Sequence, residues 1–77
     1  MFEALTLAPD QPQVRLTLAA IYNGTGQLDL ARTELQSIAD LQPRNDEVHR
    51  RIGRILALQG DRSGAVEAYR QAIVLRP

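Results

Sequence analysis

The chain has 77 residues, 44% of them hydrophobic and 23% charged, which is the composition of one small, ordinary globular domain. It contains no cysteine, and this excludes disulfides, thiolate metal sites and cysteine nucleophiles. The formal net charge is zero, so the composition argues against a general affinity for nucleic acid or for an anionic membrane. No apolar run approaches the roughly 18–20 residues that span a bilayer.

The first residues of the chain bear on the location of the protein. The opening stretch, Met-Phe-Glu-Ala-Leu, carries an acid and no base, which is unlike a secretory signal. Because the sequence also lacks cysteine and a membrane span, it favours a cytoplasmic location without fixing the compartment.

In chain order, residues 1–8 indicate the end of a helix that Pro9 stops. Asp10 is the expected N-cap of the next helix, because Gln13 follows at capping-box spacing and Pro12 fits a first turn. We interpret the two glycines after this helix as its end, since a phosphate-binding loop would need a third glycine, a lysine and a preceding strand. The expected buried face is Val14, Leu18, Ile21 and Tyr22, and the glycines are Gly24 and Gly26.

The second predicted helix covers about residues 28–41, and a short link follows it. In that link, Asn45 or Asp46 is expected to cap the third helix. Small alanines at positions 31 and 65 would let the two helices of each pair approach closely. The second helix is expected to pack three residues back onto the first: Ala31, Leu35 and Ile38.

The third and fourth predicted helices form one helix–turn–helix unit over residues 48–77. Gly60 suits the left-handed turn that ends the third helix, and Asp61 is a ready N-cap for the fourth, which Pro77 stops. Neither helix can bury its apolar face alone, so we expect the two helices to pack together, with Tyr69 in the core of the hairpin. The stripes are Val48, Ile52, Ile55 and Leu56 on the third helix, and Ala65, Tyr69, Ala72 and Ile73 on the fourth.

The same unit recurs at an offset of 34 residues. Six pairs of positions carry identical residues, and these are the residues that a helical hairpin needs for its core, its turns and its stop. Self-similarity at a fixed period is typical of a stacked repeat architecture. The pairs are Val14/Val48, Ile21/Ile55, Gly26/Gly60, Ala31/Ala65, Leu41/Leu75 and Pro43/Pro77.

The repeated residues resemble the tetratricopeptide repeat family, whose pattern is W-x2-L-G-x2-Y, then A-x3-F, then P. The resemblance covers the whole chain, with Arg15 and His49 at the tryptophan position. A pentatricopeptide RNA reader, the alternative at a similar period, has a 35-residue repeat, and no insertion here supplies the extra residue. The later copy is His49-x2-Ile52-Gly53-x2-Leu56, Ala65-x3-Tyr69, Pro77. The earlier copy is Arg15-x2-Leu18-Ala19-x2-Tyr22, Ala31-x3-Leu35, Pro43, and Ala4, Leu7 and Pro9 match the end of one more.

The resemblance implies an all-α fold, in which antiparallel helix–turn–helix repeats stack into a right-handed superhelix. It divides the chain into the trailing helix of a truncated repeat, 1–9, and two full repeats, 10–43 and 44–77. It implies a non-catalytic protein-interaction module that binds a peptide or partner protein in a concave groove, without a cofactor. The alternative is a structural repeat segment cut from a longer protein whose activity lies in another domain, which the flanking residues of the full-length gene would decide.

By the same resemblance, the first helix of each repeat lines the groove. Arg50 and Arg54 lie one helical turn apart with Arg51 beside them, and guanidinium groups bind carboxylates well, so a partner with an acidic segment is expected. The alternative is a solvated face that nearby acids balance. The family's carboxylate-clamp members need lysine and asparagine where Leu16 and Ala20 stand, which argues against that subclass. The expected groove residues are Gln13, Leu16, Ala20, Asn23, Glu47, Arg50, Arg54 and Ala57.

Residues for catalysis are scarce in this sequence. His49 is the only histidine, and the resemblance places it on the inner side of a helix in a packing role. Ser37 and Ser63 have no histidine near them in the sequence. Asp46 and Glu47 point about 100° apart on a helix, so they do not converge on one proton. We therefore expect no catalytic site and no metal site.

The two halves of the sequence differ in charge. Residues 1–43 contain two arginines and five acidic residues, whereas residues 44–77 contain seven arginines and four acidic residues, so the halves carry −3 and +3. The outer face of a terminal repeat requires a neighbour, and we therefore expect end-to-end association into a homodimer or small oligomer. The residues expected at the contacting ends are Phe2 and Leu5 at one end, and Val66, Ile73 and part of Tyr69 at the other.

Overall fold

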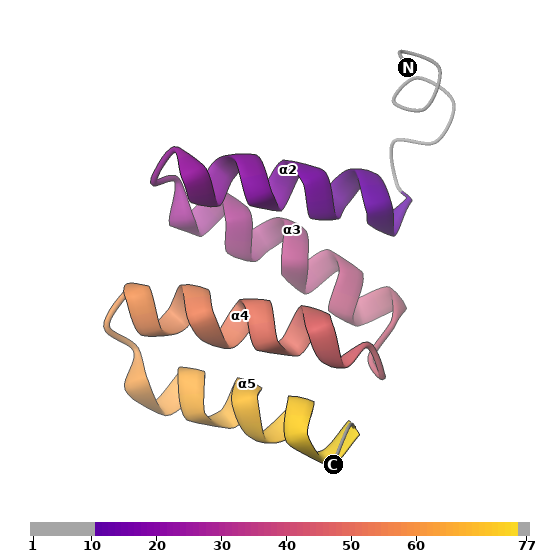
Figure 1. The fold of residues 1–77 in the computed structure, drawn as a ribbon, viewed down its shortest axis with the longest axis vertical. Helices are drawn as coiled ribbons and strands as arrows, with labels where there is room; N and C mark the ends of the chain where they lie inside the picture. The colour runs from indigo at the N-terminus through magenta and orange to yellow at the C-terminus, as the bar shows by residue number, and fades with distance from the viewer. Residues whose placement is uncertain (1–10, 76–77) are drawn as a thin grey trace.

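The structure, a computed structural model, describes residues 11–75, which form helices joined by short turns (Figure 1). Within these residues there is no strand, and no helix is long and apolar enough to cross a membrane. Consecutive helices pack side by side in chain order, so the second described helix lies between its two neighbours. The expected all-α solenoid of helix–turn–helix units is confirmed. The helices are α2 (Pro12–Gly24), α3 (Leu28–Leu41), α4 (Asp46–Leu58) and α5 (Arg62–Leu75).

The division into repeats at 10–43 and 44–77 stays a prediction. The described helices fall two within each range, α2 and α3 in the first and α4 and α5 in the second. The third predicted unit, residues 1–9, lies outside the described residues.

The starts of the helices follow local hydrogen-bonding chemistry. The Asn45 side chain accepts a bond from the backbone N–H of Val48 at 3.4 Å, and the Asp61 carboxylate accepts one from Gly64 at 2.9 Å. Both predicted caps are confirmed. At the start of α2 the prediction was wrong by one residue: Pro12 occupies the first turn, so Gln11 takes the N-cap position, without a side-chain cap bond. The expected cap, Asp10, lies outside the described residues.

The ends of α2 and α4 have the same geometry, 34 residues apart. Gly26 and Gly60 have backbone φ angles of +80° and +85°, in the left-handed region that favours glycine. The residue after each glycine donates its N–H five residues back, from Gln27 to Tyr22 at 2.8 Å and from Asp61 to Leu56 at 2.9 Å. This 6→1 bond, together with a bond from each glycine N–H to a carbonyl three residues earlier, is the Schellman arrangement. Gly26 and Gly60 therefore end these helices, as the sequence predicts, whereas Gly24, expected after the helix, is the last residue of α2.

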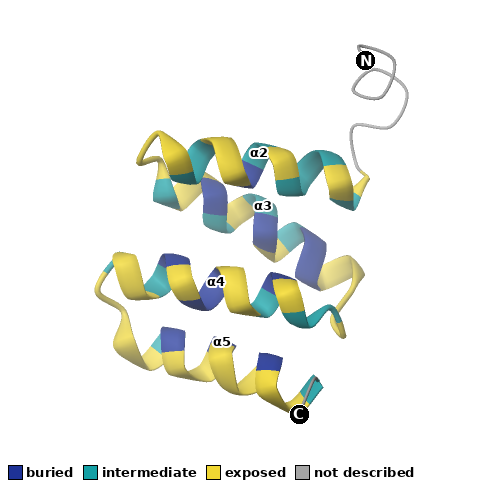
Figure 2. Cartoon of the chain, viewed as in Figure 1, coloured by how far each residue is buried: buried dark blue, intermediate teal, exposed yellow. Residues whose placement is uncertain are grey.

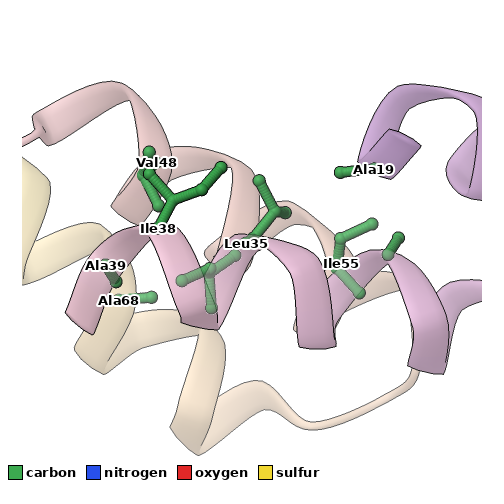
Figure 3. Packing of buried hydrophobic residues seen from close by; sticks show 9 residues of the cluster. Ala19, Leu35, Ile38, Ala39, Val48, Ile55 and Ala68 are labelled. Atoms are coloured by element: carbon green, nitrogen blue, oxygen red, sulfur yellow. The ribbon is translucent and has the colours of Figure 1, made fainter. Parts of the chain in front are cut away.

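The core is centred on α3. Figure 2 shows buried residues on the side of each helix that faces its neighbours, and Figure 3 shows side chains of this cluster from close by. Ala31 is fully buried and its repeat equivalent, Ala65, is 5% exposed, which agrees with the expected close approach within each helix pair. The buried cluster consists of Ala19, Ala31, Leu35, Ile38, Ala39, Val48, Ile52, Ile55 and Ala68.

Two residues of the repeated pairs are not in the core, contrary to expectation. Ile21 is 54% exposed, although Ile55, its equivalent in α4, is only 3% exposed. Ile55 is covered because α4 packs on α3, whereas the corresponding neighbour of α2 would fall within residues 1–9, outside the described part. Leu41, at the end of α3, is 64% exposed.

The expected stripe of α5 is only half buried. Ala65 and Ala72 are buried, but Tyr69 is 38% exposed and Ile73 65% exposed. The prediction that Tyr69 lies in the hairpin core is therefore wrong: Ala68 takes the inward place beside them. The predicted exposure of Val66 and Ile73 is confirmed.

The two kinds of glycine in this fold predict opposite effects of the same substitution. Gly60→Ala places a side chain in the left-handed region and should lower the free energy of unfolding by about 1–2 kcal/mol. Gly24→Ala, at the last residue of α2 with open space around it, should raise it by about 0.4–1 kcal/mol. Urea denaturation followed by circular dichroism measures both. Equal effects of the two substitutions would contradict the assigned helix ends.

Candidate functional site

A cavity of about 390 Å³ lies over α4 and reaches its neighbours on both sides. Its walls combine a charged rim with apolar residues that also belong to the core. The charged residues all come from α4, and the apolar surface comes from all four described helices. The lining residues are Ala19, Ala20, Asn23, Leu35, Glu47, Arg50, Arg51, Arg54, Ile55 and Tyr69.

The structure brings most of the predicted groove residues to this cavity. Leu16 is not among its lining residues, because it is half-buried and packs against the core cluster. Gln13 and Ala57 are exposed and also lie outside the lining. The predicted residues that do line the cavity are Ala20, Asn23, Glu47, Arg50 and Arg54.

The sequence analysis missed the apolar part of the site. Leu35 and Ile55 were expected only as core residues, yet both also border the cavity, with 2% and 3% of their surface exposed. Tyr69, expected in the hairpin core, reaches the cavity from α5. Helical periodicity assigns such residues to a buried face, but it does not show where two packed helices leave a space between them.

Two of the arginines are already paired within α4. Arg50 lies 3.6 Å from the Asp46 carboxylate, and Arg51 donates from Nε and Nη2 to one Glu47 oxygen at 3.1 and 2.9 Å. Both pairs have i,i+4 spacing on the helix surface and exposed arginines, so each contributes about 0.3–0.5 kcal/mol to stability. For Arg50 and Arg51, the interpretation of a face balanced by nearby acids is consistent with the geometry.

Arg54 differs from its neighbours. Among the described residues, no carboxylate lies within ion-pair distance of its guanidinium group, and no side-chain hydrogen bond involves it. The cause is its place in the sequence, since the residues four before and four after it are Arg50 and Leu58. Arg54 is therefore an exposed cation at the cavity with no anion beside it in the described part of the chain.

A second hollow, of about 480 Å³, lies between α3 and α4. Its polar side chains already bond within α3: Gln36 donates to Asp40 at 3.3 Å, and the Ser37 hydroxyl donates to the Thr33 carbonyl at 3.1 Å. It therefore offers fewer open donors to a ligand than the cavity around Arg54.

Comparison with known families identifies the repeat. A family model described as tetratricopeptide repeat matches residues 2–55. The chain belongs to the tetratricopeptide repeat family. Members of this family generally serve in protein–protein interaction and typically act as non-catalytic scaffolds. A comparison with curated proteins gives no match.

The glycine and the aromatic residue of the tetratricopeptide pattern contact each other in the second copy. A Cβ at Gly53 would lie only 3.1 Å from two carbons of the Tyr69 ring. The missing side chain lets α5 bring this ring against α4, where it forms part of the cavity wall. Gly53 is thus needed for the position of Tyr69 as well as for close packing of the helices.

His49, at the tryptophan position of the tetratricopeptide pattern, is half-buried, which agrees with its expected packing role. Its Nε2 lies 2.8 Å from the carbonyl oxygen of Pro43, so Nε2–H donates and ties α4 to the preceding link. Within residues 11–75, no group of three or more His, Asp or Glu side chains is placed to hold a metal ion.

A double-mutant cycle tests the contact between Gly53 and Tyr69. In a Tyr69→Ala background, Gly53→Ala should stabilise the protein by about 1 kcal/mol, because alanine is the better helix former. With Tyr69 present, the new methyl group must displace the ring, so the same substitution should gain less or destabilise. Urea denaturation of the four proteins gives the coupling energy. A coupling energy of zero would show that the ring and the glycine are not in contact.

Proposed function

We propose that this chain is a protein-interaction module whose cavity over α4 binds an acidic segment of a partner protein. The observation that carries this proposal is the unpaired Arg54 guanidinium at the cavity. The membership of the tetratricopeptide repeat family supports the general role in protein binding. The acidic character of the partner rests on the residues of this chain.

The charge of the lining favours an anionic ligand. Three arginines and one glutamate face the cavity, so its net charge is positive. Because Arg51 already binds Glu47 through two nitrogens, the guanidinium groups most open to a carboxylate are those of Arg54 and Arg50. They lie one helical turn apart, a spacing that suits two acidic side chains of one extended peptide.

The apolar part of the lining adds a second requirement. Tyr69 and Ala20 supply the exposed apolar surface next to the arginines, and the buried Leu35 and Ile55 border the cavity beside them. An aliphatic side chain beside the acids of the peptide would bury its surface there, at about 25 cal/mol per Å² of area removed from water. The expected ligand is therefore a short acidic segment that contains at least one aliphatic residue, rather than a run of acids alone.

Fluorescence anisotropy with a labelled short peptide of Asp, Glu and Leu tests this function. Replacing the two cavity arginines that are most open to a ligand, Arg50→Ala with Arg54→Ala, should weaken binding about fivefold to thirtyfold, because each exposed charge pair contributes about 0.5–1 kcal/mol. Binding should also weaken as salt rises, since the screening length falls from about 30 Å at 0.01 M to about 8 Å at 0.15 M.

The matched control removes two arginines that lie outside the cavity. Arg62→Ala with Arg70→Ala changes the net charge of the chain by the same amount and affects exposed residues of α5. It should leave the affinity near that of the unmodified protein. If both double variants weaken binding equally, or if neither does, the cavity is not the binding site.

A further inference from the structure

One face of α5 is exposed where the equivalent face of α3 is buried. Tyr69 and Ile73 are 38% and 65% exposed, and 34 residues earlier Leu35 and Ala39 are 2% and 6% exposed. The difference comes from a second neighbour: α3 packs between α2 and α4, whereas α4 is the main described neighbour of α5 and contacts the Tyr69 ring while leaving it partly exposed. Figure 2 shows α5 mostly exposed, with buried residues only toward α4.

The comparison of α5 with α3 also shows what kind of surface fits the exposed face of α5, because α4 covers the equivalent face of α3. The side of α4 in the core cluster presents Val48, Ile52 and Ile55, all 6% exposed or less. The equivalent residues of α2 are Val14, Leu18 and Ile21, which are apolar like those of α4. Ile21 is 54% exposed, so part of this surface is open in the described structure. The chain thus carries both halves of its own internal α3–α4 contact a second time.

We propose that copies of this chain associate head to tail, with α2 of one copy packed on the exposed face of α5 of the next. The contact repeats the packing of α4 on α3, with Ile21 covering the surface around Tyr69 and Ile73. A second copy fits this face because its α2 carries apolar residues at the positions where α4 carries Val48, Ile52 and Ile55.

A head-to-tail contact has a property that pairing of two like faces lacks. It joins two different surfaces, so each added copy presents a new free end, and assembly grows with concentration rather than stopping at a symmetric dimer. The two surfaces can also be disabled separately. This makes the arrangement distinguishable from an α5–α5 dimer, which would not need α2 at all.

The test is sedimentation velocity at micromolar to submillimolar concentrations, with two single variants and their mixture. Ile21→Asp disables the α2 surface and Ile73→Asp disables the α5 surface, and both residues are exposed enough for the variants to fold. Each variant alone should remain monomeric where the unmodified chain associates. Their equimolar mixture still contains one intact surface of each kind, so it should form a complex of two chains and no larger one.

Val74→Asp is the control, because Val74 is 76% exposed and lies about 100° around α5 from Ile73. It should associate as the unmodified chain does, and circular dichroism should show the same helicity for all variants. An unmodified chain that stays monomeric throughout would overturn the proposal. So would an Ile21→Asp variant that still associates, or a mixture in which no complex forms.

Discussion

The burial of α3 between α2 and α4 is the interaction on which the rest of the structure depends. Isolated helices of this length are marginal in water, because nucleation is costly and few residues gain a hydrogen bond. The stability of α3 therefore comes from its neighbours, which exclude water from Leu35 and Ile38. The same contact joins the first helix pair to the second, so it converts two hairpins into one core.

This contact also positions the candidate site. Stacking α4 on α3 places Ile55 next to Leu35, and the space left between them and α2 is the cavity that the arginines of α4 border. The arginines lie on the face of α4 that neither neighbour covers, which is why they stay exposed. The site therefore follows from the stacking of the helices and does not require a loop or an inserted segment.

Features with a local physical cause could be predicted from the sequence. The predicted range of the second helix agrees with α3, because Gly26 before it and Pro43 after it limit where a helix can begin and end. The turns at Gly26 and Gly60 also need only local geometry. The predicted α4 residues of the groove, apart from Ala57, line the cavity because they share one face of a regular helix.

Burial could not be predicted in the same way, because it depends on what packs against a residue. Helical periodicity predicted that Tyr69 lies in the core. Ile21 was expected to be buried like Ile55, the identical residue 34 positions later. Both Tyr69 and Ile21 are nevertheless exposed. Each lies on a face that, in the other repeat, is covered by a helix. For the same reason the apolar floor of the cavity was missed, since core residues and cavity residues share one periodic pattern.

The central claim is that neighbouring helices, rather than residue type or helix position, decide what a repeated residue contributes. Ile21 and Ile55 test it directly, because they are identical residues at equivalent positions with exposures of 54% and 3%. Urea denaturation at low micromolar concentration should show that Ile55→Ala lowers the free energy of unfolding by about 2–5 kcal/mol. Ile21→Ala should lower it by less than about 1 kcal/mol, as expected for a surface site. Equal losses for the two substitutions would contradict the account.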